Sequence, residues 1–202
     1  AEIAFAGAEL IGLRQHGGQE LMHSGDPAWW SGRAPLLFPN VGALNNNVYR
    51  LDGREFAMPK HGFARRSRFE LVESSADAAR FRLTDSAETR AIYPFAFALD
   101  MAFVGEGATL TMTATVHNRG EVDMPASFGF HPAFRWPLPD AGEDWSDVDP
   151  PHFRRCPGRR AGLRRKRLYR WLWLFGRLAR LFERRLLRPL LQLWPGLVLR
   201  LV

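Results

Sequence analysis

Large apolar residues alternate with small or polar residues along much of the first 135 positions. Every odd residue from Tyr93 to Phe103 is large and apolar, and threonines alternate with apolar residues from Thr109 to Val116. A period of two is typical of strands that bury one face. The glycines of Gly105-Glu-Gly107 lie between the two runs and predict a hairpin turn.

Shorter runs of the same kind predict three more strand pairs. They are residues 1–13 around Gly7, residues 48–51 with 55–58 across Asp52-Gly53, and residues 68–72 with 79–84 across 74–77. No segment of this region has a convincing period of 3.6, so the pattern indicates an all-β sandwich or barrel. Between the strands run loops rich in aromatic residues, and loops on a β scaffold commonly carry binding sites.

The charge changes sign after this region. The whole chain has a net charge of +7, but residues 1–150 hold 13 Lys and Arg against 20 Asp and Glu. Residues 151–202 hold 15 Lys and Arg and a single acid, Glu183. We therefore expect a β-sandwich domain over residues 1–140 and an atypical Arg/Leu-rich tail over residues 141–202, helical or disordered.

The tail supports two interpretations. Residues 167–187 fit a basic amphipathic helix, which would bind anionic membranes or polyanions. The interpretation that we favour is non-native sequence, produced by a shifted reading frame or by truncation and joining, in the place where further strands of the sandwich are expected. We therefore expect no nucleic-acid or membrane partner apart from this tail. Translating the alternative frame of the gene tests the hypothesis.

Cysteine usage and the N-terminus favour the cytoplasm. The one cysteine, Cys156, excludes an internal disulfide framework and a cysteine-rich metal site. The first residues do not combine a basic stretch with an apolar run, as a signal peptide would. No stretch of about 18 uncharged apolar residues predicts a membrane span.

Two histidines stand in short aromatic motifs, His61 in HGFAR and His131 in FGFHPAFRW. If the β fold brings them together, they supply a proton donor and a group that orients hydroxyls. That pair suits ring opening of a sugar, because the unperturbed pKa of histidine, about 6.5, lies close to neutral pH. His16, His23, His117 and His152 lack such a context, and we interpret them as surface or structural residues.

Six blocks in order carry a resemblance to a known family. They are GAEL (7–10), GDPAWW (25–30), GRAPLLFPNVG (32–42), LDGREFAMPKHGFAR (51–65), YPFAFAL (93–99) and SFGFHPAFRWPL (127–138). Together they resemble the aldose 1-epimerase (galactose mutarotase) family, in the HGFAR-containing branch similar to hexose-6-phosphate 1-epimerases. The resemblance implies an antiparallel supersandwich of the galactose mutarotase type, incomplete here at its C-terminal side.

The resemblance also implies an activity, the interconversion of α and β anomers of a hexose or hexose phosphate without metal or other cofactor. It implies that His131 is the acid and that His61 orients the sugar, with Arg33 on sugar hydroxyls. Arg65 is a candidate for an anionic substituent, and Trp30 for stacking on the sugar.

The glutamate base of that family has no counterpart that we can identify, because Glu183 lies in an unlike, basic context. A carbohydrate-binding protein without catalysis therefore remains an alternative, beside the membrane or polyanion binder that the tail suggests.

Overall fold

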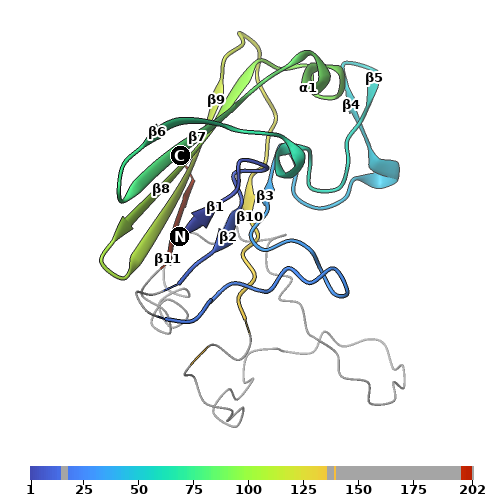
Figure 1. The fold of residues 1–202 in the computed structure, drawn as a ribbon. Helices are drawn as coiled ribbons and strands as arrows, with labels where there is room; N and C mark the ends of the chain where they lie inside the picture. The colour runs from blue at the N-terminus through green and yellow to red at the C-terminus, as the bar shows by residue number, and fades with distance from the viewer. Residues whose placement is uncertain (15–17, 136–138, 140–196, 202) are drawn as a thin grey trace, which may run out of the picture.

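A computed structural model describes residues 1–14, 18–135, 139 and 197–201, and strands dominate this part of the chain (Figure 1). The main sheet has the strand order β11-β9-β8-β7-β6. Its members are β6 (Glu70–Ser74), β7 (Ala78–Thr84), β8 (Phe97–Glu106), β9 (Thr109–Asn118) and β11 (Leu197–Leu201). Three two-stranded sheets complete the strands of the described part: β1 (Glu2–Ile3) with β2 (Leu10–Gly12), β3 (Leu36–Leu37) with β10 (Gly129–Phe130), and β4 (Val48–Leu51) with β5 (Arg54–Ala57).

The alternation predicted the longest hairpin correctly. β8 and β9 pair antiparallel over ten residue pairs, and the register places Leu99 opposite Val116 and Phe103 opposite Met112. Their turn, at Gly107 and Ala108, lies slightly beyond the centre of the predicted one. The expected pairs β1–β2, β4–β5 and β6–β7 are also present. The fold class is therefore all-β, as predicted.

The core joins the main sheet to the small sheets. Phe97, Leu99 and Met101 of β8 are completely buried, as are Leu10 of β2 and Leu36 of β3. All five belong to one hydrophobic cluster. In Figure 1 the small sheets β1–β2 and β3–β10 lie beside the main sheet, while α1 and the β4–β5 hairpin lie at its upper right.

The strand expected from Tyr93 starts later, at Phe97, because a short helix precedes it. Helix α1 (Ala87–Ile92) has a capping box, in which Ser86 Oγ accepts from the Thr89 amide and Thr89 Oγ1 accepts from the Ser86 amide. Six residues are too few to display a helical period, so the alternation could not indicate it. The spacing Ser86-Ala-Glu-Thr89 was the available signal.

The end of the tail also differs from the expectation of helix or disorder. Leu197–Leu201 forms β11, which pairs in parallel with β9. The physical reason is that an edge of β9 offers unpaired backbone N–H and C=O groups, which an extended segment satisfies. The amphipathic helix expected over residues 167–187 lies outside the described residues, and the domain boundary at residue 140 stays a prediction.

Candidate functional site

The two motif histidines lie close together. The ring centroids of His61 and His131 are 6.2 Å apart, although 70 residues separate them in the chain. His131 directly follows β10, and β10 pairs with β3. Phe38, just after β3, forms a parallel bridge with Gly62. The segment of β3 and Phe38 therefore lies between the two histidine-bearing segments and holds them together.

His61 sits in an unusual backbone conformation. Its φ is +67°, in the left-handed region that residues with side chains seldom adopt. The His61 amide donates to the Gly42 carbonyl at 2.8 Å, and the Gly42 amide donates to His61 Nδ1 at 3.0 Å. Because Nδ1 accepts this bond, the neutral ring carries its proton on Nε2.

The surroundings of His61 favour the neutral ring. Burial lowers the pKa of His61 below its ordinary value of 6.5, and the nearby charges of Lys60, Arg65 and His131 lower it further. Desolvation penalises the charged imidazolium, and positive neighbours repel it. His61 is therefore neutral at pH 7 and can donate a hydrogen bond from Nε2.

His131 differs from His61 in its contacts. Its Nδ1 is buried and has no hydrogen-bond partner among the described residues. A buried Nδ1 cannot reach a ligand, so a proton passing between this ring and a bound molecule would move through Nε2. His131 packs against Trp30, with ring centroids 5.3 Å apart and the planes tilted by 59°.

Four aromatic rings lie in a row, in the order His61, His131, Trp30 and His23. His23 stacks on Trp30 at 6.1 Å, and its Nε2 lies 3.1 Å from the Trp30 carbonyl oxygen. The indole also covers Gly32, where a Cβ would meet the ring at 2.5 Å. His23, interpreted from the sequence as surface or structural, thus packs against Trp30, which in turn packs against His131.

The two predicted arginines occupy different environments. The guanidinium of Arg33 donates to the carbonyl oxygens of Ile11 and Ser24. The backbone carbonyl of Arg33 accepts a hydrogen bond from the Ala133 amide. Its guanidinium is thus used to hold loops together, and sugar binding by Arg33 stays a prediction. Arg65, in the short 3₁₀ helix η2 (Ala64–Arg66), is near enough to His61 to lower its pKa.

Sequence reasoning did not single out Asn40 and Gly42. Both lie in the PLLFPNVG block, and the Asn40 side chain donates from Nδ2 to the Gly42 carbonyl at 3.0 Å. The order of residues in that block carried no sign that Gly42 would contact His61, which is 19 positions away. The only available hint was that an Asn and a Gly occur together in a loop with unusual aromatic content.

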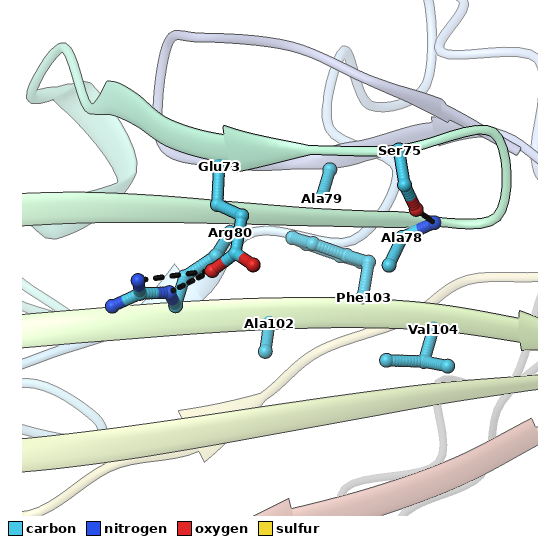
Figure 2. Close-up of a pocket in the computed structure, with 8 residues that line it drawn as sticks. All are labelled: Glu73, Ser75, Ala78, Ala79, Arg80, Ala102, Phe103 and Val104. Atoms are coloured by element: carbon cyan, nitrogen blue, oxygen red, sulfur yellow. Dashed lines mark hydrogen bonds and ion pairs between the residues drawn. The ribbon is translucent and has the colours of Figure 1, made fainter.

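A depression elsewhere on the surface holds none of these groups (Figure 2). It lies over β6, β7 and β8, and small or apolar side chains such as Ala102 and Val104 line most of it. Its polar side is the ion pair of Arg80 with Glu73, at 3.0 Å. Without a histidine or any predicted site residue, it offers no comparable chemistry.

The described ranges contain neither a metal-binding cluster nor a helix suited to span a membrane. Within residues 1–14, 18–135, 139 and 197–201, no cluster of three or more His, Cys, Asp or Glu side chains is placed to hold a metal ion. In the same part of the chain, no helix has the length and apolar character needed to cross a membrane.

Comparisons with known proteins agree on one family. The family model described as aldose 1-epimerase matches residues 1–147. The chromosomal protein LacX of Lactococcus lactis subsp. lactis is 33% identical over 147 residues, which are 70% of this chain and 49% of LacX. This chain therefore spans about half the length of the curated relatives that it matches.

Solved structures give the same result. A galactose mutarotase-like protein from Lactobacillus casei is 37% identical, with a TM-score of 0.64 over 65% of this chain and 45% of that protein. A galactose mutarotase related enzyme from Lactobacillus acidophilus is 34% identical, with a TM-score of 0.68 over 72% of this chain and 48% of that enzyme.

Proposed function

This chain belongs to the aldose 1-epimerase family, and from that premise we propose that it interconverts the α and β anomers of a hexose or a hexose phosphate. One observation carries the proposal. The rings of His61 and His131 lie 6.2 Å apart, close enough to face the same sugar ring. Paired groups of this kind can move a proton to the ring oxygen while they orient the sugar.

His131 is the proton donor in this proposal. Its Nε2–H gives a proton to the ring oxygen, and the bond between that oxygen and C1 breaks. The anomeric hydroxyl loses its proton to a base, which leaves an open-chain aldehyde. Rotation about the C1–C2 bond followed by the reverse steps returns the proton to His131 and forms the other anomer. No oxidation occurs, and atoms and charge balance between the sugar, His131 and the base that takes the anomeric proton.

His61 acts as a hydrogen-bond donor in the same scheme. Its lowered pKa keeps the ring neutral, and the bond that Nδ1 accepts from Gly42 keeps the proton on Nε2. A neutral donor can hold an oxygen of the sugar without competing for the proton that His131 transfers. Trp30 packs against His131, and its indole is the group that we assign to stacking on the sugar.

The finer choice of substrate depends on charge. Lys60 and Arg65 lie near enough to His61 to affect its pKa. Two cations beside a sugar site favour an anionic substituent such as a phosphate. We therefore include hexose phosphates in the proposed substrate class, with Arg65 as the residue to contact the phosphate. Arg33 assists by fixing the loops around the site.

Polarimetry tests the proposal directly. Freshly dissolved α-D-galactose, α-D-glucose and a hexose 6-phosphate are followed with the full chain, with His131→Asn and with His61→Asn. We expect acceleration by the unchanged protein and a loss of about 10²–10⁴-fold in His131→Asn. His117→Asn is the matched control, because His117 lies on β9 beside Asp100, and it should keep full activity. Full activity in His131→Asn would contradict the proposed acid.

A carbohydrate-binding protein without catalysis is the second candidate. One observation favours it: the glutamate base that the family resemblance implies has no counterpart that we can identify, because Glu183 lies in an unlike, basic context. Ring opening needs a base for the anomeric hydroxyl, so the described site could bind a sugar without turning it over. Thermal stabilisation by a sugar, together with unchanged mutarotation, would support binding over catalysis.

A further inference from the structure

The loop from Phe38 to Gly42 contacts the segment that carries His131. The Ser127 amide donates to the Pro39 carbonyl at 2.9 Å, and Ser127 Oγ accepts from the Val41 amide at 3.1 Å. Ser127 lies four residues before His131. These two bonds anchor one side of the loop and limit how far its peptide groups can move.

The other side of the loop contacts His61 through Gly42. The Gly42 peptide groups make both bonds to this residue, one with the backbone amide and one with Nδ1 of the ring. These bonds hold a residue whose φ is +67°, a conformation that an unrestrained histidine would tend to leave. The position of Gly42 therefore decides both where the imidazole points and which nitrogen carries its proton.

Asn40 is the side chain that holds Gly42. Its Nδ2 donates to the Gly42 carbonyl at 3.0 Å, the same oxygen that accepts from the His61 amide. A carbonyl oxygen only accepts hydrogen bonds, so the amide group of Asn40 must face it with nitrogen rather than oxygen. The orientation of the Asn40 side chain is thereby fixed.

This orientation has a cost. It leaves Asn40 Oδ1 buried, with no hydrogen-bond partner among the described residues. Buried acceptors without partners are rare in native structures, because water would otherwise stabilise them. An alanine at this position would remove the unpaired oxygen together with the bond to Gly42. Stability therefore does not explain why an asparagine stands here instead of an alanine. What the asparagine adds is its hydrogen bond to the Gly42 carbonyl.

We propose that Asn40 is a positioning residue of the site: by holding the Gly42 carbonyl, and so the position of this residue, it keeps the Gly42 amide on Nδ1 of His61, the ring in the Nε2–H form and that N–H directed toward the bound sugar. The link from Asn40 to the His61 proton stands on the hydrogen bonds alone. Its catalytic consequence rests on the proposed function.

Nitrogen NMR of the histidine rings tests the link. In the full chain labelled with ¹⁵N-histidine, long-range ¹H–¹⁵N spectra at pH 7.5 distinguish a protonated ring nitrogen from an unprotonated one. We expect His61 in the Nε2–H form in the unchanged protein, and His61→Asn identifies its signal. An Nδ1–H form in the unchanged protein would overturn the proposal without any variant at Asn40.

Two variants at Asn40 then test its part. Asn40→Ala should shift His61 toward a mixture of the two forms and lower kcat/KM by about tenfold or more, because even a shift of about 1 Å in a positioning group can cost on the order of 100-fold. Asn40→Asp should shift it further, because a carboxylate repels the Gly42 carbonyl. Asn45→Ala, at an exposed position of the short 3₁₀ helix η1 (Asn45–Asn47), is the control and should change neither readout.

The outcomes separate this proposal from the proposed function. If the unchanged protein does not accelerate mutarotation but Asn40→Ala still shifts the form of His61, the proposed function fails and the positioning role stands. If Asn40→Ala folds with His61 fully in the Nε2–H form, the positioning role is refuted, whatever the activity. A shift of the same size in Asn45→Ala would refute it as well.

Discussion

Gly62 offers the sharpest test of how the HG turn is held. Its φ is +71°, and a Cβ built on it would lie 2.0 Å from the Phe38 carbonyl oxygen and 2.6 Å from the Pro39 nitrogen. Both are backbone atoms, and a Cβ does not approach other atoms below 3.0 Å in real structures. Gly62→Ala must therefore push the HG turn away from the loop after β3.

The expected destabilisation has two parts. The left-handed backbone costs a residue with a side chain about 1–2 kcal/mol. Forcing a methyl group into a filled space typically costs about 1–3 kcal/mol more. The sum, about 2–5 kcal/mol, is a large share of the roughly 5–15 kcal/mol by which a domain is usually stable.

Gly53→Ala separates the two parts. Gly53 has nearly the same φ, +76°, but a Cβ there would meet nothing within 4 Å. This control therefore carries the conformational cost alone, about 1–2 kcal/mol. The difference between the two variants measures the contact between Gly62 and Phe38.

Urea unfolding followed by tryptophan fluorescence measures both variants. We expect a clearly lower midpoint for Gly62→Ala than for Gly53→Ala, with similar slopes. A Gly62→Ala protein that does not fold, beside a Gly53→Ala protein that does, agrees with the same reasoning. Equal midpoints for the two variants would show that the HG turn does not press on the backbone at Phe38, and the proposed arrangement of the site would be wrong.

Three further predictions concern the core, the main sheet and His61. Phe97→Ala empties a fully buried position and should cost about 3–5 kcal/mol in urea unfolding. Arg82→Met removes two bonds of 2.6 Å to Asp100, whose pKa the Arg82 hydrogen bond lowers. The pair stabilises the fold above pH 3.8 and less as pH falls through the lowered pKa. We therefore expect Arg82→Met to lower the stability at pH 7 and to lower it less toward pH 2. Equal losses at the two pH values would contradict the pairing. His61 should titrate below its ordinary pKa of 6.5 in NMR, chiefly because it is buried, so its contribution to stability falls as pH drops below about 6.5. His61→Gln should flatten that part of the pH profile of stability, and a midpoint above 6.5 would refute the prediction.

Much of the sheet could be predicted from the sequence because strand alternation is a local property. The odd residues from Phe97 to Phe103 are the large buried side chains of β8, and the threonines of β9 lie on the opposite face from Leu110 and Met112. Helix α1 was missed because it is shorter than two helical turns, and its capping box was a weaker signal than the apolar residues that follow.

The site was only partly predictable. The motifs identified His61 and His131, and the family resemblance implied that they act together. Their contacts could not be predicted, because they depend on distant backbone groups. The guanidinium of Arg33 binds the Ile11 carbonyl 22 residues away, and the ring of His61 binds an amide 19 residues away. Sequence patterns with short periods contain no information about such pairs.

Because of the left-handed backbone at His61, stability and the proposed chemistry favour different residues at this position. Glycine adopts that φ without strain, so selection for thermal stability alone would tend to replace His61 with glycine. A stabilised descendant of this chain obtained without a sugar assay would therefore tend to lose the ring to which we assign the orientation of the sugar. Any screen for more stable variants should therefore include an activity measurement from its first round.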